Sequence, residues 1–251
     1  MLQLFALHRI CGWDSPTVDL IPLFETVDDL QVSQEIMHNL YSNPFYSAHL
    51  KTRNMKQTIM LGFSDGTKDG GYFMANWSIY KAKEELSDVS GDFGVAVAFF
   101  DGRGGPPARG GGNTHKFYAS MGDRIKADDI QLTVQGQTIS SNFGTLDSSQ
   151  FNLEQLLSSG ISNQVFKNDD NQFADKDRIT MQQLAYISYQ SYSDFKSHPK
   201  FVSYLENMST LQYYSKTNIG SRPSKRGSSS KLNFSDLRAI PFVGSWSQSK
   251  Q

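Results

Sequence analysis

The stretch VDLIPLF (residues 18–24) has two counterparts further along the chain, QTIMLGF (57–63) and VAVAFF (95–100). All three are short, rich in β-branched or aromatic residues, and apolar almost without alternation. This pattern is typical of strands that are buried on both faces of a parallel sheet. A weaker segment of the same kind, IQLTVQ (130–135), predicts a fourth strand.

Helices are predicted between these strands. Apolar residues recur at three- and four-residue steps from 30 to 41 and from 74 to 86, and a third helix is expected to begin near Thr114. The alternation indicates successive βα units. We therefore expect an α/β fold, namely part of a (β/α)8 TIM-type barrel with additional helices. We divide it into a helix over 1–17, βα units with metal and phosphate sites over 18–145, and, over 146–251, further helices together with a binding segment that contains GSRP and LRAIP. One of these helices, over 181–195, carries a stripe of tyrosines.

Composition narrows the class of protein. The 251 residues carry 24 basic and 25 acidic side chains, a net charge of −1, so no overall field would attract nucleic acid or an anionic membrane. Cys11 has no partner for an intrachain disulfide, and no apolar run approaches the roughly 20 residues of a membrane span. We expect a cytoplasmic protein without a nucleic acid or membrane partner.

Polar side chains follow the first two predicted strands. Glu25 comes after the first, and Asp65 and Lys68 flank a predicted glycine-containing turn in LGFSDGTKDGG after the second. Carboxylates at neighbouring strand ends can hold Mg²⁺ or Mn²⁺, which prefer oxygen ligands, and Lys68 would then lie beside a bound anion. The alternative is that these acidic residues only cap helices or anchor loops.

A glycine-rich segment with two arginines follows the third strand. In FDGRGGPPARGGGNTH, Arg103 and Arg109 are surrounded by glycines, which let backbone N–H groups approach an anion while guanidinium groups grip phosphate or carboxylate. The segment lacks the Gly-Lys-Ser/Thr of a Walker A loop. An RNA-binding arginine–glycine tract is an alternative, although such tracts are long and this one is short and follows a buried strand.

A second basic segment, NIGSRPSKRGSSSKLNFSDLRAIPF, begins at Asn218 and contains Arg222 and Arg238. Basic serine-rich stretches are usually solvated loops. Arg238 differs, because it stands in the apolar sequence LRAIPF, where an unpaired guanidinium would be costly. We expect it to have an anionic partner.

These segments, in this order, resemble phosphoenolpyruvate carboxylase. The family carries FET-DD, a GYSDSAKD-like turn, FHGRGG…GRGG, TVQGE and GSRP-KR…LRAIPW-FAW, and the match extends from about Ile21 to Trp246. The resemblance implies a lyase that makes oxaloacetate and phosphate from phosphoenolpyruvate and bicarbonate, supplies the tricarboxylic acid cycle and is usually a homotetramer.

The resemblance also implies roles for individual residues. Glu25 and Asp65 would be the Mg²⁺ or Mn²⁺ ligands, and Arg103 and Arg238 would hold the phosphate and carboxylate of phosphoenolpyruvate. The other residues predicted for the catalytic pocket are Lys68, Asp101, Arg109 and Arg222.

Three positions depart from the family pattern. Asp101 stands where the family usually has a histidine thought to assist carboxylation, Gln137 where glutamate is common, and Phe242 where tryptophan is common. An aspartate at 101 would place negative charge beside an anionic substrate. The change is therefore expected either to be a variant of one lineage or to alter that step.

Family members are several times longer, and they carry a catalytic histidine and another substrate arginine in the amino-terminal part. We therefore expect this chain to be a fragment truncated at both ends and poorly stable in isolation, because an opened barrel exposes strand edges. The alternatives are an enzyme portion that is active within a longer polypeptide and a non-catalytic remnant that retains only metal or anion binding.

Overall fold

The computed structural model describes residues 2–13, 16–103, 113–126, 128–134, 136–165, 174–214 and 232–248. At its centre is a parallel sheet with the strand order β1-β2-β3-β4. The strands are β1 (Leu23–Phe24), β2 (Lys56–Leu61), β3 (Ala96–Asp101) and β4 (Ile130–Leu132). All four predicted strands are therefore present, although β1 pairs over two residues only and β4 over three.

Helices account for most of the remaining described chain. They are α1 (Leu2–Ile10), α2 (Val27–Gln31), α3 (Ser33–Ser42), α4 (Pro44–Thr52), α5 (Phe63–Gly70), α6 (Tyr72–Asp92), α7 (Thr114–Ala119), α8 (Gln137–Phe143), α9 (Leu146–Val165), α10 (Asp175–Ser197), α11 (Phe201–Met208), α12 (Leu211–Tyr214) and α13 (Ala239–Gln248), with a 3-10 helix, η3, at Phe234–Asp236. No helix within these ranges is long and apolar enough to cross a membrane.

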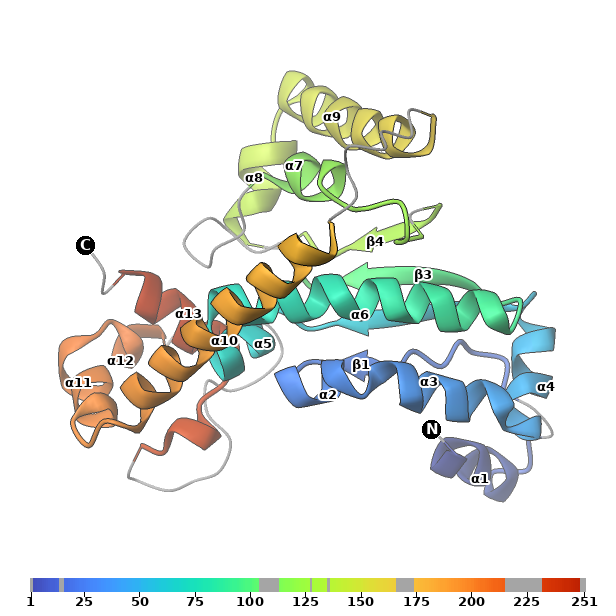
Figure 1. Ribbon diagram of the computed structural model, residues 1–251, viewed down its shortest axis with the longest axis horizontal. Helices are drawn as coiled ribbons and strands as arrows, with labels where there is room; N and C mark the ends of the chain where they lie inside the picture. Colours follow the sequence, from blue (N-terminus) through green and yellow to red (C-terminus); the bar gives the residue numbers. More distant parts are fainter. Residues whose placement is uncertain are drawn as a thin grey trace.

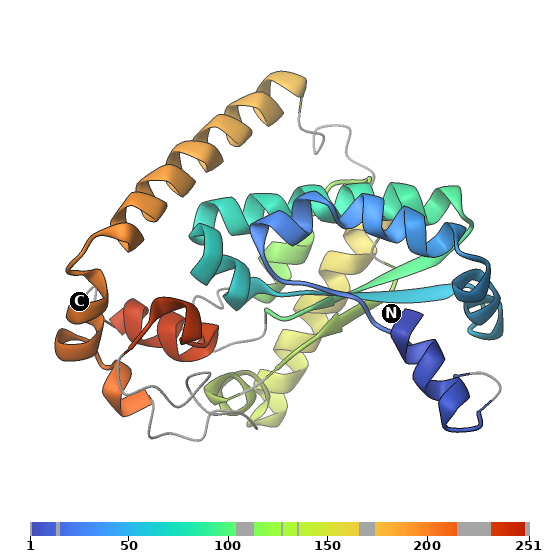
Figure 2. The ribbon, with the colours of Figure 1, turned by 90° about the horizontal axis from the view of Figure 1, so that it is seen from below.

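The core lies between the sheet and the helices that join its strands. Helices α3 and α6 pack side by side on the same face of the sheet (Figures 1 and 2). Ile59 and Leu61 of β2 and Leu86 of α6 are fully buried there. Because neighbours in the sheet are also neighbours in sequence and their connecting helices share a face, the architecture is one of sequential parallel βα units.

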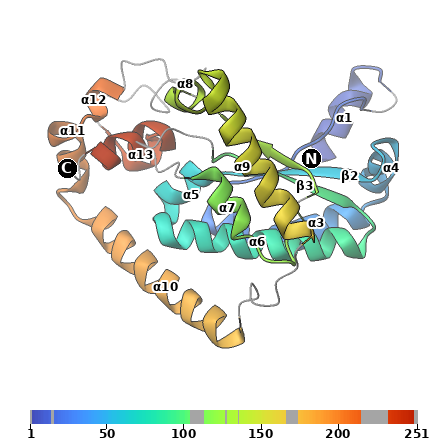
Figure 3. The ribbon, with the colours of Figure 1, turned by 90° about the horizontal axis from the view of Figure 1, so that it is seen from above.

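A second group of helices lies beyond the carboxyl ends of the strands. The strand arrows in Figure 1 point toward α5 and α13, and Figure 3 shows α10 running from beside α6 to the group formed by α11, α12 and α13. Phe201, Leu205 and Phe242 form the core of this group. Helix α13 packs against α5, so a helix from the last part of the sequence lies next to the carboxyl end of the sheet.

One local prediction was wrong. The segment around Gly66, predicted as a glycine-containing turn, forms helix α5 instead. Its glycines are required by packing: a Cβ at Gly70 would lie 2.5 Å from Cγ2 of Val27, and one at Gly66 would lie 3.4 Å from Cβ of Ala75. Tertiary contacts have thus overridden the low helix propensity of glycine.

Candidate functional site

The predicted site residues of the first three strands lie at one edge of the sheet. Phe24 pairs with Leu61, and Leu61 pairs with Asp101, so the three strands end level with one another. Glu25 follows β1 directly, Asp65 lies in the first turn of α5 after β2, and Arg103 follows β3 after one glycine. The parallel register therefore brings these residues together, as was predicted for strand ends in α/β proteins.

Glu25 is in close contact with the start of α5. The Gly62 N–H donates to the carbonyl oxygen of Phe24 at 2.9 Å. A Cβ built on Gly62 would lie only 2.7 Å from Cβ of Glu25, and one on Gly66 would lie 3.5 Å from the Glu25 carbonyl oxygen. Glu25 and Asp65 are both partly exposed. Glu25 and Asp65 are therefore both residues of the junction between β1 and α5.

Side-chain bonds hold this junction in place. Asp69 of α5 accepts a hydrogen bond at its Oδ2 from the Val27 N–H, at 2.9 Å, which ties α5 to the start of α2. The Tyr192 hydroxyl of α10 donates to the Lys68 carbonyl oxygen at 3.0 Å, and Lys196 donates to the Asp69 carbonyl oxygen. Residues more than 120 positions away therefore fix the helix that carries Asp65 and Lys68.

Arg103 has the properties of an anion-binding arginine. Its guanidinium carbon lies 4.2 Å from the ring centroid of Phe117, and its Nη1 is buried without a hydrogen-bond partner among the described residues. Burial lowers the pKa of Arg103, which means that its positive charge is poorly solvated. A charge in this condition favours an anionic ligand.

Asp101 is buried beside Arg103. It is fully inaccessible, and its Oδ2 accepts hydrogen bonds from Nζ of Lys83 at 2.7 Å and from the Tyr118 hydroxyl at 2.8 Å. Burial strongly raises the pKa of Tyr118, with the Asp101 charge adding to the effect, so this hydroxyl stays protonated as a donor. The negative charge that sequence analysis placed beside the substrate is therefore paired with a buried lysine.

The second predicted substrate arginine lies at the start of α13. The Arg238 carbonyl oxygen accepts from the Phe242 N–H, and its Nε is buried with no hydrogen-bond partner in the described part of the chain. Nζ of Lys68 lies 4.9 Å from the ring centroid of Phe234, just before this helix. Packing of α13 on α5 thus brings the Lys68 and Arg238 segments together. Arg109 and Arg222 lie outside the described residues.

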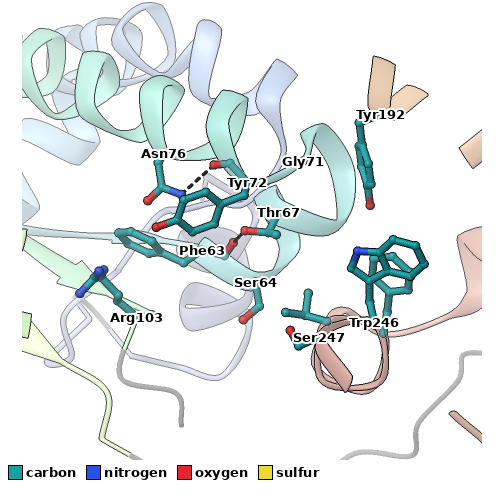
Figure 4. A pocket seen from close by; sticks show the side chains of 13 residues that line it. Phe63, Ser64, Thr67, Gly71, Tyr72, Asn76, Arg103, Tyr192, Trp246 and Ser247 are labelled. Atoms are coloured by element: carbon teal, nitrogen blue, oxygen red, sulfur yellow. Dashed lines mark hydrogen bonds between the residues drawn. The ribbon is translucent and has the colours of Figure 1, made fainter. Parts of the chain in front are cut away.

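A cavity of about 270 Å³ opens between α5, α6, α10 and α13. Arg103 lies on one side of it and Tyr192 and Trp246 on the other, with Ser64 and Ser247 between them (Figure 4). Sequence analysis assigned Tyr192 to packing and did not single out Trp246 for a site. The only signal for Tyr192 in the sequence is the stripe of tyrosines at helical spacing, and a helix face that packs against the core explains this stripe equally well.

The carboxyl groups fit a magnesium-type ion better than a tightly coordinated metal. The described residues contain no group of three or more histidine, cysteine, aspartate or glutamate side chains that could hold a metal. Mg²⁺ often uses one or two carboxylates and completes its shell with water and substrate phosphate. Glu25 and Asp65, both partly exposed and both following strand ends at one edge of the sheet, provide this kind of donor set.

Fold and site together describe a parallel α/β protein in which two acidic residues, Glu25 and Asp65, and one arginine, Arg103, follow the carboxyl ends of the strands. A family model described as phosphoenolpyruvate carboxylase matches residues 1–251. The chain is 37% identical over 235 residues to the phosphoenolpyruvate carboxylase of Corynebacterium diphtheriae, covering 93% of this chain and 26% of that protein. It is 38% identical over 255 residues to that of Corynebacterium efficiens, covering 100% of this chain and 27% of that protein.

The chain therefore belongs to the phosphoenolpyruvate carboxylase family. It spans about a quarter of the length of these relatives.

Proposed function

We propose that this chain carries part of the metal and substrate site of a phosphoenolpyruvate carboxylase. The observation that supports this most is the level end of the sheet, where Glu25, Asp65 and Arg103 come together in a chain of that family. The reaction would combine phosphoenolpyruvate with bicarbonate and yield oxaloacetate and phosphate. Bicarbonate attacks the phosphorus to give carboxyphosphate and the pyruvate enolate, and the enolate carbon then bonds to carbon dioxide released from carboxyphosphate.

The proposed roles follow from charge and position. Arg103 and Arg238 bind the phosphate and carboxylate of phosphoenolpyruvate, because each has a buried guanidinium nitrogen without a hydrogen-bond partner in the described ranges. Lys68, Arg109 and Arg222 would belong to the same substrate site. Glu25 and Asp65 hold Mg²⁺ or Mn²⁺, which when bound polarises substrate oxygens and stabilises enolate charge.

We propose further that the sheet is part of a (β/α)8 barrel. The sequential parallel strand order and the shared face of α3 and α6 are what a barrel requires. In the described part of the chain, β1 and β4 each have one edge without a neighbouring strand. Residues outside this sequence would then complete the barrel and the site, in a cytoplasmic homotetramer.

The test is phosphoenolpyruvate- and bicarbonate-dependent formation of oxaloacetate by the natural polypeptide that contains this sequence. Arg103→Met should lower kcat/KM by about tenfold to a hundredfold, because a hydrogen bond to a charged group contributes about 1.5–3 kcal/mol. Arg53→Met is the matched control, since Arg53 forms an exposed ion pair with Asp19 instead. Metal and phosphate binding without any turnover would favour the non-catalytic alternative.

A further inference from the structure

Lys83 is a fully buried lysine that sequence analysis treated only as part of a helix. It lies within α6, its side chain is 2% exposed, and its Nζ is 2.7 Å from Oδ2 of Asp101, whose side chain is 0% exposed. The ring centroids of Phe99, Phe117 and Tyr118 lie 5.1–5.7 Å from the same nitrogen. Water is thus replaced by one carboxylate and three aromatic rings.

This ion pair is coupled to Arg103. Phe117 is shared, because the Arg103 guanidinium carbon lies 4.2 Å and Nζ of Lys83 lies 5.3 Å from its ring centroid. Burial lowers the pKa of both Lys83 and Arg103, and in both cases the charge of Asp101 opposes this effect. The Asp101 carboxylate therefore interacts with two cations, Lys83 and Arg103. Of these two, only Arg103 lines the cavity.

Charge balance shows why the lysine matters. Asp101 is two residues from Arg103, and by itself its carboxylate would reduce the attraction between Arg103 and a bound anion. With Lys83 in place the pair is neutral, and Arg103 contributes a net positive charge to the cavity. Because α6 and β3 are both packed in the core, the lysine cannot leave the carboxylate without a large rearrangement.

We propose that Lys83 and Asp101 form a single neutral unit that positions Arg103 and preserves its charge for the substrate anion. Lys83 is then a positioning residue of the site, and Asp101 is not its proton donor. The proposal rests on the proposed function insofar as Arg103 binds the substrate anion. It explains how an aspartate can occupy this strand end without weakening the site.

A double-mutant cycle tests the proposal, with inorganic phosphate as the probe and isothermal titration at low ionic strength as the measurement. The natural polypeptide containing this sequence is compared with Lys83→Met, Asp101→Asn and the double variant. Lys83→Met leaves an unpaired carboxylate beside Arg103 and should weaken phosphate binding by about tenfold. Asp101→Asn removes the negative charge and should bind phosphate at least as tightly as the unmodified protein.

The double variant is neutral again and should bind phosphate within about threefold of the unmodified protein, since buried ion pairs are often replaceable by uncharged pairs. A purely structural role predicts instead that both single variants and the double variant all weaken binding. That pattern would overturn the proposal. If Lys83→Met does not fold, Asp101→Asn and the double variant still test the proposal. Phosphate binding that is tenfold weaker in either of these two variants would contradict it.

The outcomes for the two proposals differ. Phosphate binding with the expected cycle but no oxaloacetate formation would overturn the proposed function and leave the role of Lys83 intact. Oxaloacetate formation together with weaker phosphate binding in both single variants and the double variant would support the proposed function and overturn the proposed role of Lys83. An unmodified protein that binds no phosphate would overturn both, because Arg103 would then not be an anion site.

Discussion

Replacing Gly62 by alanine is expected to displace Glu25 and weaken metal binding. Gly62 has φ −92° and ψ 98°, which alanine adopts without strain. The effect must therefore come from the added methyl group. Its carbon would lie 2.7 Å from Cβ and 3.1 Å from Cα of Glu25.

The magnitude follows from these contacts. Carbon atoms in contact are normally about 3.5–4.0 Å apart, so the two chain segments must separate by roughly 1 Å. Overpacking of this size costs about 1–3 kcal/mol, part of which is offset by the smaller conformational entropy of unfolded alanine. We expect Gly62→Ala to lower the free energy of unfolding by about 1–2 kcal/mol. Displacement of a ligand should weaken Mn²⁺ binding by tenfold or more.

The assay is isothermal titration calorimetry with Mn²⁺, together with urea unfolding of the same samples. Gly91→Ala is the matched control, because Gly91 lies in α6 and, apart from the backbone of its own helix, no atom of the described residues lies within 4 Å of where a Cβ would stand. This variant should be about 0.5–1 kcal/mol more stable and should bind Mn²⁺ unchanged. Equal Mn²⁺ affinity and equal stability in the two variants would refute the placement of Glu25 at the metal site.

Two further predictions concern stability. Arg178 forms a bidentate ion pair with buried Glu84, with both N···O distances 2.7 Å, and Arg178→Met should cost about 2 kcal/mol in urea unfolding. The exposed Arg53–Asp19 pair should contribute less than about 1 kcal/mol. If Arg53→Met lost as much free energy of unfolding as Arg178→Met, this reasoning would be contradicted. Burial, with the charge of Arg53, lowers the pKa of His49. The unfolded chain therefore binds more protons, and stability should fall as pH drops below about 6.5, the ordinary pKa of histidine. His49→Gln should flatten this fall between pH 7.5 and 5.5, and an unchanged pH slope of the urea midpoint would argue against it.

The strands were predictable because buried parallel strands leave an unusual sequence pattern. Residues 59–63 and 95–100 carry no polar side chain, and the predicted segments 57–63 and 95–100 correspond to β2 and β3 with shifts of one or two residues. The first strand was predicted from 18–24 but pairs only at Leu23 and Phe24. Helix α5 was missed because its glycines are selected by contacts with Val27 and Ala75, which local sequence cannot reveal.

The site was predictable only in part, for a similar reason. Glu25, Asp65 and Arg103 could be placed together because each follows a strand and parallel strands end at one edge. The partner of Asp101 could not be predicted, since Lys83 is 18 positions away in helix α6 and local sequence does not reveal which strand end it faces. Tyr192, which holds α5 from 124 positions away, could not be distinguished from a packing residue.

The proposed metal and substrate site is tested most directly by a crystal structure of the natural polypeptide with Mn²⁺ and phosphoenolpyruvate, with the metal located by anomalous scattering. We predict a Mn²⁺ peak between the carboxyl groups of Glu25 and Asp65, with the substrate phosphate or carboxylate bonded to Arg103. Mn²⁺ bound elsewhere, or a substrate that leaves Arg103 without a contact, would contradict it.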